Sequence, residues 1–579
     1  MKRTGRQIVL LVAIGLVIAV LLTVSAGGAL PASAQGPSVR GPFHGKSVVP
    51  TSFNGNLSEL PKVTENKPPR VFPLRGRVSA SDLLTSPDIW SKAAPPSQSP
   101  SAAPNTLAPT QSFDGIGWTN IGWPPDPNGD VGPNNYIQAV NTSFAIYSKT
   151  GVLQAGPTTL DALFSPLGTS TPCGNHQNVG DPVVLYDQIA DRWLITDFAF
   201  ATSVLGNPIP PYYECIAVSK TSDPVAGGWY LYPLLADNTL LNDYPKLGLW
   251  PDAYYMTANM FNLSTNDVHV RVWALDRNSM LSGGPLNDVF FDLPTCSATD
   301  ATCPYYSLLP SNVRGTLPPA GSPNYLANIE TANTAAAVPY SSNVVHFWKY
   351  ALTGSWPNPT ATFTGPFNVT VNTFLEGLWT TKSGNITMSL VPQRGTTTRL
   401  DTLGDRLMMQ LQYRNIGGVE SLWATHTVGV PVGSSTVTGI RWYQFNVSGG
   451  SFTVAQQGDY APNDGLWRWM PSLAVDSKGD MGIGYSVSSS TTYPSIRAAG
   501  RLVGDPAGQL PQGEAVLVNG GGSQTRALLT GPITRWGDYS ALTIDPADDC
   551  TFWYTNEYYK TSGTHWSTRI GSKKFPSCP

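Results

Sequence analysis

The chain has 579 residues, of which 41% are hydrophobic and 13% are charged, and its formal net charge is −3 at pH 7. This balance supplies neither a basic stripe for nucleic acid nor a polybasic patch for anionic lipid, so neither partner class is favoured. Aromatic residues make up 10% of the chain and include seventeen Trp. Such a composition is typical of a β-rich exported protein, in which most Trp rings lie in packed cores and a minority stack on the flat faces of sugars.

The N-terminus predicts export. Met1-Lys2-Arg3 and Arg6 precede an apolar run over residues 8–24, and Ala32-Ser33-Ala34 offers a cleavage site. Residues 1–34 are therefore predicted to be a signal peptide, with a retained membrane anchor as the alternative. We expect a protein that is secreted or displayed on the cell surface, and that touches a membrane only through this segment if it is not cleaved.

A Pro-rich stretch follows the predicted signal peptide. Residues 35–112 include Ala93-Ala94-Pro95-Pro96 near their end, a composition that cannot bury a hydrophobic core. We expect a disordered linker here, acting as a spacer or a stalk. From residue 113 the hydrophobic alternation has the period of β-strands, so residues 113–579 are predicted to form one all-β domain.

Seven stretches of this domain share a pattern of a polar turn followed by two short aromatic and β-branched runs. They begin near Gly129-Asp130, Gly180-Asp181-Pro182, Asp243-Tyr244-Pro245, Pro323-Asn324-Tyr325, Gly404-Asp405-Arg406, Trp469-Met470-Pro471 and Gly537-Asp538-Tyr539. The spacing of about fifty to eighty residues is close to that of four-stranded blades. We therefore predict a seven-bladed β-propeller, with six and eight blades as alternatives. Strands from both ends of the domain are expected to close the ring, because closure removes exposed sheet edges.

Three polar turns within the repeats are expected to be hairpin turns rather than ligand sites. Asp187-Gln188-Ile189, Asp476-Ser477-Lys478 and Asp545-Pro546-Ala547 each follow an apolar run and precede another. An Asp carboxylate at such a position accepts hydrogen bonds from nearby backbone amides, which stabilises the turn.

Six cysteines fit an oxidising compartment, where an even number indicates disulfides rather than metal ligands. Cys296 and Cys303 are close enough in sequence to staple one loop. Cys550 and Cys578 are placed to tie the last repeat to the C-terminal segment, which leaves Cys173 to pair with Cys215. Six cysteines allow fifteen pairings, so this connectivity is one prediction among several.

The repeats resemble those of the sialidase-like β-propeller superfamily. The run from Pro471 to Ser486 is similar to a blade motif of that superfamily, and residues 180–187 and 537–546 follow the same pattern. The region from about Leu400 to Cys578 also resembles a group of uncharacterised exported bacterial proteins. The full sialidase Asp-box, with Ser before the Asp and Trp closing the turn, is not met at any repeat. The resemblance therefore implies the architecture rather than the sialidase reaction.

Sialidases hold the carboxylate of their substrate with three arginines, and add a Tyr nucleophile, a Glu that activates it and an Asp acid/base. The resemblance implies a catalytic set made of Arg406, Arg468, Arg535, Asp538, Tyr539 and Glu557. Guanidinium groups suit this role because their geometry matches a carboxylate. The structural alternative is that Arg beside Trp makes cation–π contacts and that Arg beside Asp makes an ion pair.

Side chains next to this set are candidates for ligand binding, namely Trp467, Trp469, Arg497 and Trp536. Asp126, Asn128 and Asp130 carry closely spaced oxygens that suit Ca²⁺, although the Gly between them is misplaced for an EF-hand loop, and a tight turn is the simpler interpretation. No other cofactor is expected. The six His are scattered singly, without the spacing of metal ligands.

The sequence carries no His-Glu-x-x-His motif and no Gly-x-Ser-x-Gly elbow, which leaves few catalytic classes. We predict an exported propeller that recognises an extracellular glycan or protein. The first alternative is a sialidase-like glycoside hydrolase, and the second is a structural protein of the cell surface. A hydrolase would need two acidic groups, or an acid and an activated Tyr, close together beneath an arginine cluster, whereas a binding module would not.

Overall fold

The computed structural model describes residues 39–63, 70–71, 109–118, 122–204, 206–265, 267–296, 305–330, 341–376, 379–380, 386–387, 389–433, 435–525, 527–528, 531–532 and 535–578. The predicted signal peptide, most of the predicted linker and Cys303 lie outside these residues. The described elements are almost all β-strands. The helical elements are short: α2 (Leu160–Phe164), α3 (Arg277–Leu281), η1 (Leu57–Glu59), η3 (Ser165–Leu167) and η4 (Ser448–Gly450).

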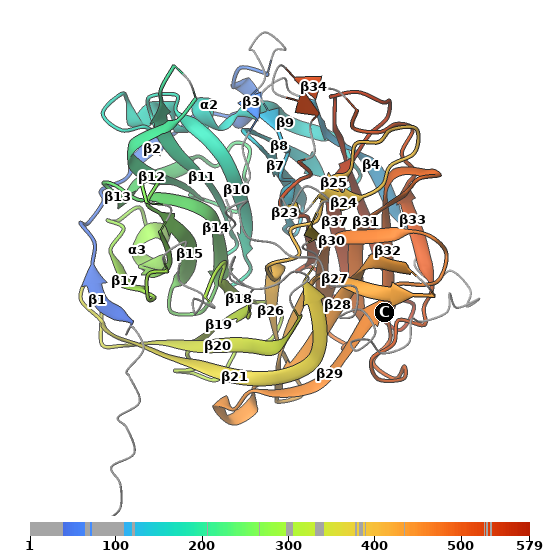
Figure 1. The fold of residues 1–579 in the computed structure, drawn as a ribbon. Helices are drawn as coiled ribbons and strands as arrows, with labels where there is room; N and C mark the ends of the chain where they lie inside the picture. The colour runs from blue at the N-terminus through green and yellow to red at the C-terminus, as the bar shows by residue number, and fades with distance from the viewer. Residues whose placement is uncertain are drawn as a thin grey trace, which may run out of the picture. The chain divides into compact units, whose positions relative to one another are not determined.

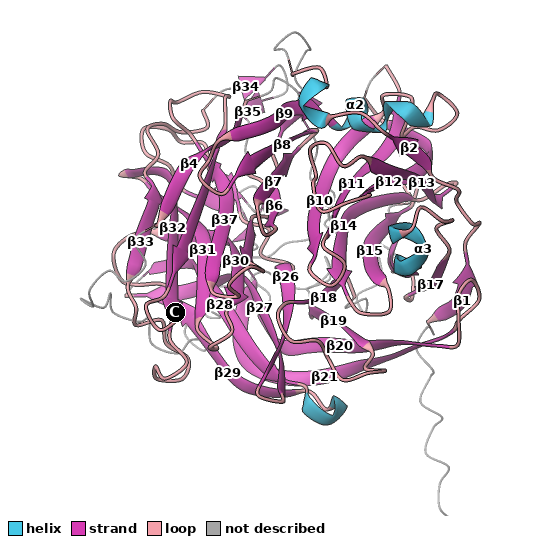
Figure 2. Ribbon diagram, turned by 180° about the vertical axis from the view of Figure 1, so that it is seen from behind, coloured by secondary structure: helices cyan, strands magenta, loops and turns pink. Residues whose placement is uncertain are grey.

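Among the described residues, the principal strands form six sheets, one of which has eight strands and consists of two antiparallel halves joined by a parallel pair. With these halves counted separately there are seven antiparallel groups, each named here by its first strand (Figures 1 and 2). The β6 group contains β6 (Asn128–Val131), β7 (Asn135–Val140), β8 (Ser143–Ser148) and β9 (Leu153–Thr159). The β10 group contains β10 (Asn178–Asp187), β11 (Arg192–Thr202), β12 (Pro208–Ser219), β13 (Trp229–Asp237) and β2 (Thr51–Phe53). The β14 group contains β14 (Leu241–Leu249), β15 (Tyr254–Phe261), β16 (Val268–Leu275), β17 (Asp288–Asp292) and β1 (Arg40–His44).

The second half of the domain continues the pattern. The β18 group contains β18 (Leu309–Val313), β19 (Asn324–Ile329), β20 (Ser341–Thr353) and β21 (Thr360–Glu376). The β26 group contains β26 (Met408–Ile416), β27 (Val419–Val432), β28 (Ser435–Asn446) and β29 (Thr453–Tyr460). The β30 group contains β30 (Trp467–Val475), β31 (Met481–Ser489), β32 (Thr492–Arg501) and β33 (Glu514–Val518). The β36 group contains β36 (Ala541–Ile544), β37 (Thr551–Tyr558), β38 (Ser567–Lys574) and β4 (Gln111–Gly117).

Short two-stranded pairs complete the described strands. They are β3 (Arg70–Val71) with β5 (Gly122–Trp123), β22 (Trp379–Thr380) with β23 (Ile386–Thr387), β24 (Ser389–Val391) with β25 (Leu400–Asp401), and β34 (Ala527–Leu528) with β35 (Gly531–Pro532).

The first strands of the seven groups contact one another in a closed ring, from β6 through β10, β14, β18, β26, β30 and β36 back to β6. Some backbone N–H groups of the first strands make no hydrogen bond to a neighbouring strand and need another acceptor. Side chains of the neighbouring first strand supply several of these acceptors. Val184 N donates to Asn128 Oδ1 over 2.9 Å, and Leu542 N donates to Ser472 Oγ over 2.9 Å. β18 and β26 instead pair directly as parallel strands. A ring of first strands, each followed by antiparallel strands leading outward, is the arrangement of a β-propeller.

The two ends of the domain meet in the β36 group. Its outermost strand is β4, which comes from the N-terminal side of the chain and pairs with the C-terminal strand β38, so that Phe113 lies opposite Ile570. The prediction that strands from both ends close the ring is confirmed. The fourth predicted repeat start, at Asn324, falls on β19 rather than on the first strand β18.

The prediction of a disordered linker over residues 35–112 is wrong for residues 39–63, which form β1, η1 and β2 and which we call the N-terminal belt. β1 pairs with β17, β2 pairs with β13, and Lys62 bridges to Thr158 in β9, so the belt crosses the outer edges of three groups. These edges offer unpaired backbone groups, and the belt satisfies them despite its Pro and Gly content. The belt also anchors hydrophobically, because Leu57 is completely buried.

The hydrophobic cores lie between neighbouring groups. The largest completely buried side chains include ten Trp, as expected for rings that mainly serve packing. Glycine makes room for such rings between the β30 and β36 groups. A Cβ added at Gly484 would lie 2.4 Å from the Tyr554 ring, and one at Gly482 would lie 2.9 Å from Phe552.

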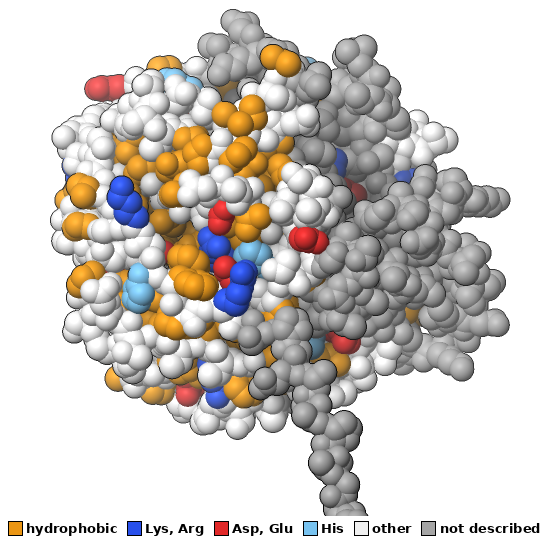
Figure 3. All heavy atoms as spheres, turned by 60° about the vertical axis from the view of Figure 1, so that its left-hand side comes forward, with side chains coloured by type: hydrophobic (Ala, Val, Ile, Leu, Met, Phe, Trp, Pro, Cys, Tyr) orange, Lys and Arg blue, Asp and Glu red, His pale blue; other side chains and the backbone are white. Residues whose placement is uncertain are grey.

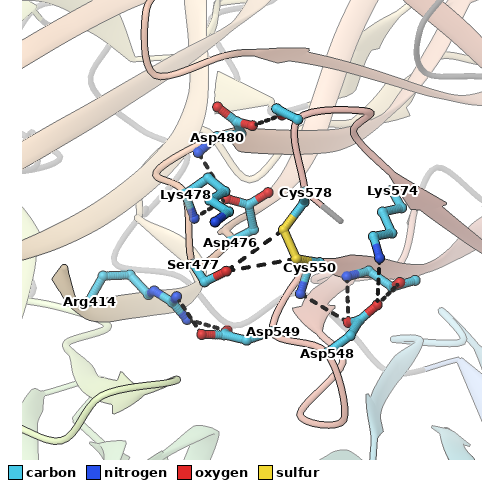
Figure 4. The surroundings of a disulfide bond; sticks show 12 residues. Arg414, Asp476, Ser477, Lys478, Asp480, Asp548, Asp549, Cys550, Lys574 and Cys578 are labelled. Carbon is cyan, nitrogen blue, oxygen red and sulfur yellow. Dashed lines mark hydrogen bonds and ion pairs between the residues drawn. A yellow bond between two sulfur atoms is a disulfide. The ribbon is translucent and has the colours of Figure 1, made fainter. Parts of the chain in front are cut away.

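Two of the predicted disulfides are confirmed, Cys173–Cys215 and Cys550–Cys578. The second joins the turn before β37 to the chain after β38 and packs against Ser477 of the neighbouring β30 group (Figure 4). The third pairing is not tested, because Cys303 is not described.

On the face that Figure 3 shows, Lys and Arg side chains are few, and those near its centre lie among Asp and Glu side chains rather than forming one basic patch, in agreement with the low charge of the sequence. In the part of the chain that the structure describes, no helix is long and apolar enough to cross a membrane.

Candidate functional site

A local distortion recurs in several first strands and places polar side chains at one end of the ring. Asp181, Tyr244 and Met470 have positive φ values of 52°, 57° and 54°, and each is followed by Pro. The pairing register of each strand shifts at this point. Pro cannot donate to a sheet ladder, so a bulge forms there and re-aims the side chains beside it. Positive φ is costly for residues other than Gly and is concentrated at functional sites.

Asp126, which has φ 45° and also precedes Pro, begins a hydrogen-bonded chain across this end of the ring. It accepts from Asp538 N over 2.6 Å and from Asn141 Nδ2 over 2.8 Å. Asn141 Oδ1 accepts from Asp181 N over 2.8 Å, and Asp181 Oδ2 accepts from Tyr244 N over 3.1 Å. Three side chains thus tie together backbone of the β36, β10 and β14 groups.

Arg535 lies between two carboxylates next to this chain. Its Nη1 lies 3.0 Å from Asp401 Oδ2, and its Nη2 lies 2.6 Å from Asp538 Oδ1. Asp401 also accepts from Trp536 N over 2.6 Å, and Glu557 Oε2 accepts from Gly537 N over 2.9 Å. The segment that leads into β36 is therefore held by carboxylates on both sides.

Lys246 is the second cationic side chain at this end of the ring. Its Nζ lies 3.4 Å from the centre of the Tyr244 ring and 4.2 Å from that of Tyr539, and donates to Pro245 O over 2.8 Å. Tyr539 OH donates to Pro182 O over 3.1 Å. The lysine is almost completely buried, so the two rings take over part of the hydration that the ammonium group loses.

The third cation is Arg406. It forms a two-pronged ion pair with Asp405, with distances of 2.8 and 3.0 Å. Its guanidinium group also lies over the rings of Tyr244 and Tyr306, at 4.7 and 5.0 Å from their centres. We call the whole set the axial cluster, defined as Asp126, Asp181, Tyr244, Lys246, Asp401, Asp405, Arg406, Trp469, Arg535, Trp536, Asp538, Tyr539 and Glu557.

Burial and mutual repulsion shift the protonation of this cluster. Burial, helped by the neighbouring Asp243 and Asp538, raises the pKa of Asp181 to about 7. Burial also raises the pKa of Asp126 and of Glu557 well above the usual range of carboxylic acids. Burial lowers the pKa of Lys246 to about 8, against the opposing effect of nearby carboxylates such as Asp181. The cluster therefore holds an acid and a base that both titrate near neutral pH, which is the range needed for proton transfer.

Several polar atoms of the cluster are buried without any hydrogen-bond partner. They are Tyr244 OH, Trp469 Nε1 and Glu557 Oε1. Unpartnered buried atoms also occur elsewhere in the described residues, for example at Tyr136 OH, and those of the cluster differ in lying beside several aromatic rings and titratable groups. Asp181, Arg535 and Asp538 keep the most exposure among the charged members, at 8, 9 and 7%, and are the layer of the cluster nearest to solvent.

The predicted site residues divide into two places. Arg406, Arg535, Asp538, Tyr539, Glu557, Trp469 and Trp536 all belong to the axial cluster. Arg468 and Arg497 instead share Glu514, at 2.9 and 2.5 Å, and Arg468 also pairs with Asp464 at 2.6 Å. Trp467 is partly exposed beside Arg468. The arginines therefore do not form the single open set that a sialidase would need.

Sequence reasoning missed Asp181, Tyr244, Lys246, Asp401 and Asp405 as site residues. The Asp-Pro and Tyr-Pro steps at residues 181–182 and 244–245 were part of the repeat pattern, and the recurring Pro was the available signal. Lys246 and Asp401 carry no local motif, because their role depends on contacts between distant strands.

The residues predicted for calcium do not fit that ion. Asn128 Oδ1 accepts from Val184 N, and Asp130 accepts from Tyr186 N and Thr543 Oγ1 and pairs with Arg314. Asp126 is committed to Asn141 and to the backbone of Asp538. Donors of the protein thus occupy the oxygens that calcium would need. Among the described residues, no group of three or more His, Cys, Asp or Glu is placed to hold a metal ion.

Below the axial cluster, the ring of first strands leaves little free space. A cavity of about 10 Å³ is lined by residues of β6, β10, β18, β26, β30 and β36, including Asp130 and Arg314. This is about the space of one water molecule, so a larger ligand would be confined to the end of the ring.

No protein family model and no curated protein sequence matches this chain. An exo-β-1,3-galactanase from Phanerochaete chrysosporium is 11% identical, covers 65% of this chain and 80% of its own, and has a TM-score of 0.25. A Trypanosoma rangeli sialidase with the inhibitor DANA is 8% identical, covers 73% and 57%, and has a TM-score of 0.28. An endo-1,5-α-L-arabinanase from Thermotoga petrophila is 11% identical, covers 77% and 97%, and has a TM-score of 0.22. At these scores the likenesses carry no weight for the activity of this chain.

Proposed function

We propose that this protein is an exported, seven-bladed β-propeller that recognises a glycan at the axial cluster. The observation that carries this proposal is the set of buried, unpartnered polar atoms, Tyr244 OH, Trp469 Nε1 and Glu557 Oε1, beside aromatic rings and titratable groups. Sugar hydroxyls both donate and accept hydrogen bonds, and sugar rings present apolar faces that stack on aromatic side chains. A glycan that enters beside Asp181, Arg535 and Asp538, the most exposed charged members, would bring hydroxyl partners to these atoms.

Two further observations support the propeller and its location. The seven groups of described strands and the ring of contacts between their first strands support the proposed seven blades. The disulfides Cys173–Cys215 and Cys550–Cys578 support an oxidising compartment, as expected for an exported protein.

The test uses substitutions that remove the unpartnered atoms of Tyr244 and Trp469. Tyr244→Phe removes only a hydroxyl that makes no hydrogen bond within the protein, so we expect the fold to persist. Trp469→Phe also removes part of a completely buried ring and leaves a cavity, so its unfolding midpoint is measured beside its affinity. Each variant should weaken binding to the best ligand on a glycan array about tenfold, the effect of one lost hydrogen bond to a ligand. Titration calorimetry of the full chain measures this change.

Tyr136→Phe is the matched control, because Tyr136 OH is also buried and unpartnered but lies on β7, next to Trp553 and outside the axial cluster. It should leave affinity unchanged. Undiminished binding in both Tyr244→Phe and Trp469→Phe would place the ligand elsewhere. Absence of any glycan binding by the wild-type chain would favour a protein ligand or a structural role.

Glycoside hydrolysis is the second candidate, and the pKa of about 7 for Asp181 favours it. A carboxylic acid that is still protonated near neutral pH can protonate a glycosidic oxygen, while the neighbouring Asp538, which pairs with Arg535, would act on the opposite face of the sugar. Asp181→Asn should then abolish sugar release, measured by chromatography, while binding changes less than tenfold. Arg497→Ala, outside the axial cluster, should leave release unaffected. Binding without release by the wild-type chain would leave recognition as the whole function.

A further inference from the structure

The cations of the axial cluster are already matched by carboxylates of the protein. Arg535 faces Asp401 at 3.0 Å and Asp538 at 2.6 Å, so both terminal nitrogens of the guanidinium group have an acidic partner. Arg406 uses its Nε and Nη2 on Asp405, and its flat face is covered by Tyr244 and Tyr306. Neither arginine offers the free two-pronged fork that binds a ligand carboxylate.

Lys246 is not a free binding partner for a ligand carboxylate either. Its ammonium group lies between the rings of Tyr244 and Tyr539 and donates to Pro245 O. The electrostatic neighbours that favour its charge are Asp181, Asp538 and Asp126. A ligand anion near this lysine would also lie near these three acidic groups, and it would lose its own hydration on entering the cluster.

The atoms that do lack partners suit an uncharged ligand. Tyr244 OH can donate or accept, Trp469 Nε1 donates, and Glu557 Oε1 accepts when ionised or donates when protonated. A hydroxyl group satisfies each of these atoms without bringing charge. The T-shaped pair of Trp469 and Trp536, with ring centres 5.4 Å apart, is completely buried beside them and packs the cluster rather than facing a ligand.

We infer that the ligand of the axial cluster is an uncharged, hydroxyl-rich saccharide and that the site rejects acidic sugars such as sialosides and uronates. The inference rests on the proposed glycan recognition and adds the chemical class of the ligand. It differs from the sialidase resemblance, in which free arginines would hold a substrate carboxylate.

Matched pairs of oligosaccharides that differ by one carboxylate test the inference. A galactose-terminated oligosaccharide is compared with its sialylated form, and a gluco-oligosaccharide with its glucuronate-terminated form, by calorimetry on the full chain at pH 7. In each pair that binds, the neutral member should bind at least tenfold more tightly. An acidic member that binds equally well or better would overturn this inference while leaving the proposed glycan recognition intact. Binding of neither member of either pair, nor of any other glycan on the array, would overturn both.

A variant that gains affinity for the acidic sugar provides a second test, because a misfolded protein would not show such a gain. Asp538→Asn removes one of the two carboxylates at Arg535, so the preference for the neutral member should fall at least tenfold. Asp464→Asn is the control, because it releases Arg468 from a similar ion pair outside the cluster and should leave the preference unchanged. A preference that stays the same in Asp538→Asn, with an unfolding transition like that of the wild type, would overturn the role assigned to the matched Arg535.

Discussion

Three hairpin Asp residues that look alike in the sequence have different surroundings. Asp187 pairs with Arg277 through both oxygens, at 2.6 and 3.0 Å, and accepts from Tyr254 OH over 2.7 Å. Asp545 pairs with Lys149. Asp476 accepts two backbone amides through Oδ1, but its buried Oδ2 has no partner. All three stabilise turns, as the sequence predicted, but one of them is left with an uncompensated carboxylate oxygen.

Asp476 should therefore make stability depend on pH. Burial, with a contribution from Asp480, raises its pKa to about 7, whereas an Asp in an unfolded chain titrates near 4. The folded state holds the proton more tightly, so stability falls as pH rises from about 4 to about 7 and stays lower above that. Asp476→Asn should raise the free energy of unfolding at pH 8 by roughly 1–3 kcal/mol and change it little at pH 4.

Thermal unfolding of Asp476→Asn at the two pH values checks this expectation. Asp187→Asn is the control, since it breaks the ion pair with Arg277 and should destabilise the protein at both pH values. A loss of stability at pH 8 in Asp476→Asn would contradict the prediction.

The sequence identified part of the axial cluster because some of its residues are neighbours in the chain. Arg535, Asp538 and Tyr539 lie within five residues, and that proximity made them candidates. Asp401 reaches Arg535 from a strand more than a hundred residues away, and Lys246 meets Tyr539 from the β14 group. No short motif encodes such contacts, so only the fold brings these groups together.

At the scale of strands, the repeat pattern located most first strands because Pro and a polar residue mark their bulges. The β18 group is the exception. Its first strand begins at Leu309 without a Gly-Asp or Asp-Pro step, so the pattern was found one strand later, at Asn324. β18 pairs directly with β26 as a parallel strand, and its Asn312 Oδ1 still accepts from Leu249 N over 3.1 Å, as polar side chains of other first strands do.

The packing between the β30 and β36 groups depends on glycine. Tyr554 cannot easily move away from Gly484, because its hydroxyl group bonds to both Ser540 and Asn556. Gly484→Ala would place a methyl group 2.4 Å from the Tyr554 ring and should lower the free energy of unfolding by about 1–3 kcal/mol.

Urea unfolding measures this effect. Gly504→Ala is the matched control, because the added Cβ would meet no atom within 4 Å and should change stability by less than about 0.5 kcal/mol. Equal stability of the two variants would show that the interface between these groups can relax.

At the scale of the whole molecule, closure of the ring joins strands from both ends of the domain. Cys550–Cys578 lies in the group where closure occurs and spans 28 residues. A cross-link of this length is expected to stabilise the folded state by about 3 kcal/mol, chiefly by restricting the unfolded chain. The double variant Cys550→Ser with Cys578→Ser should therefore unfold several degrees lower under oxidising conditions. Differential scanning calorimetry checks this, and an unchanged midpoint would exclude a stabilising role for the bond.

The all-β class and the closure by both ends were predictable, because they follow from strand periodicity and from the cost of exposed edges. The N-terminal belt was not, because Pro and Gly normally indicate a linker. Its order comes from the free edges of β13 and β17, which are remote in sequence.

The belt also determines how the domain responds to tension. A force applied to the chain ahead of residue 39 acts first on β1 and then on β2, which are held by three residue pairs each. These short edge strands peel away one hydrogen bond at a time, whereas β4, which closes the ring, lies beyond residue 109 and receives the load later. We therefore expect β1 and β2 to detach first under load, which lengthens the chain while the ring of first strands stays closed.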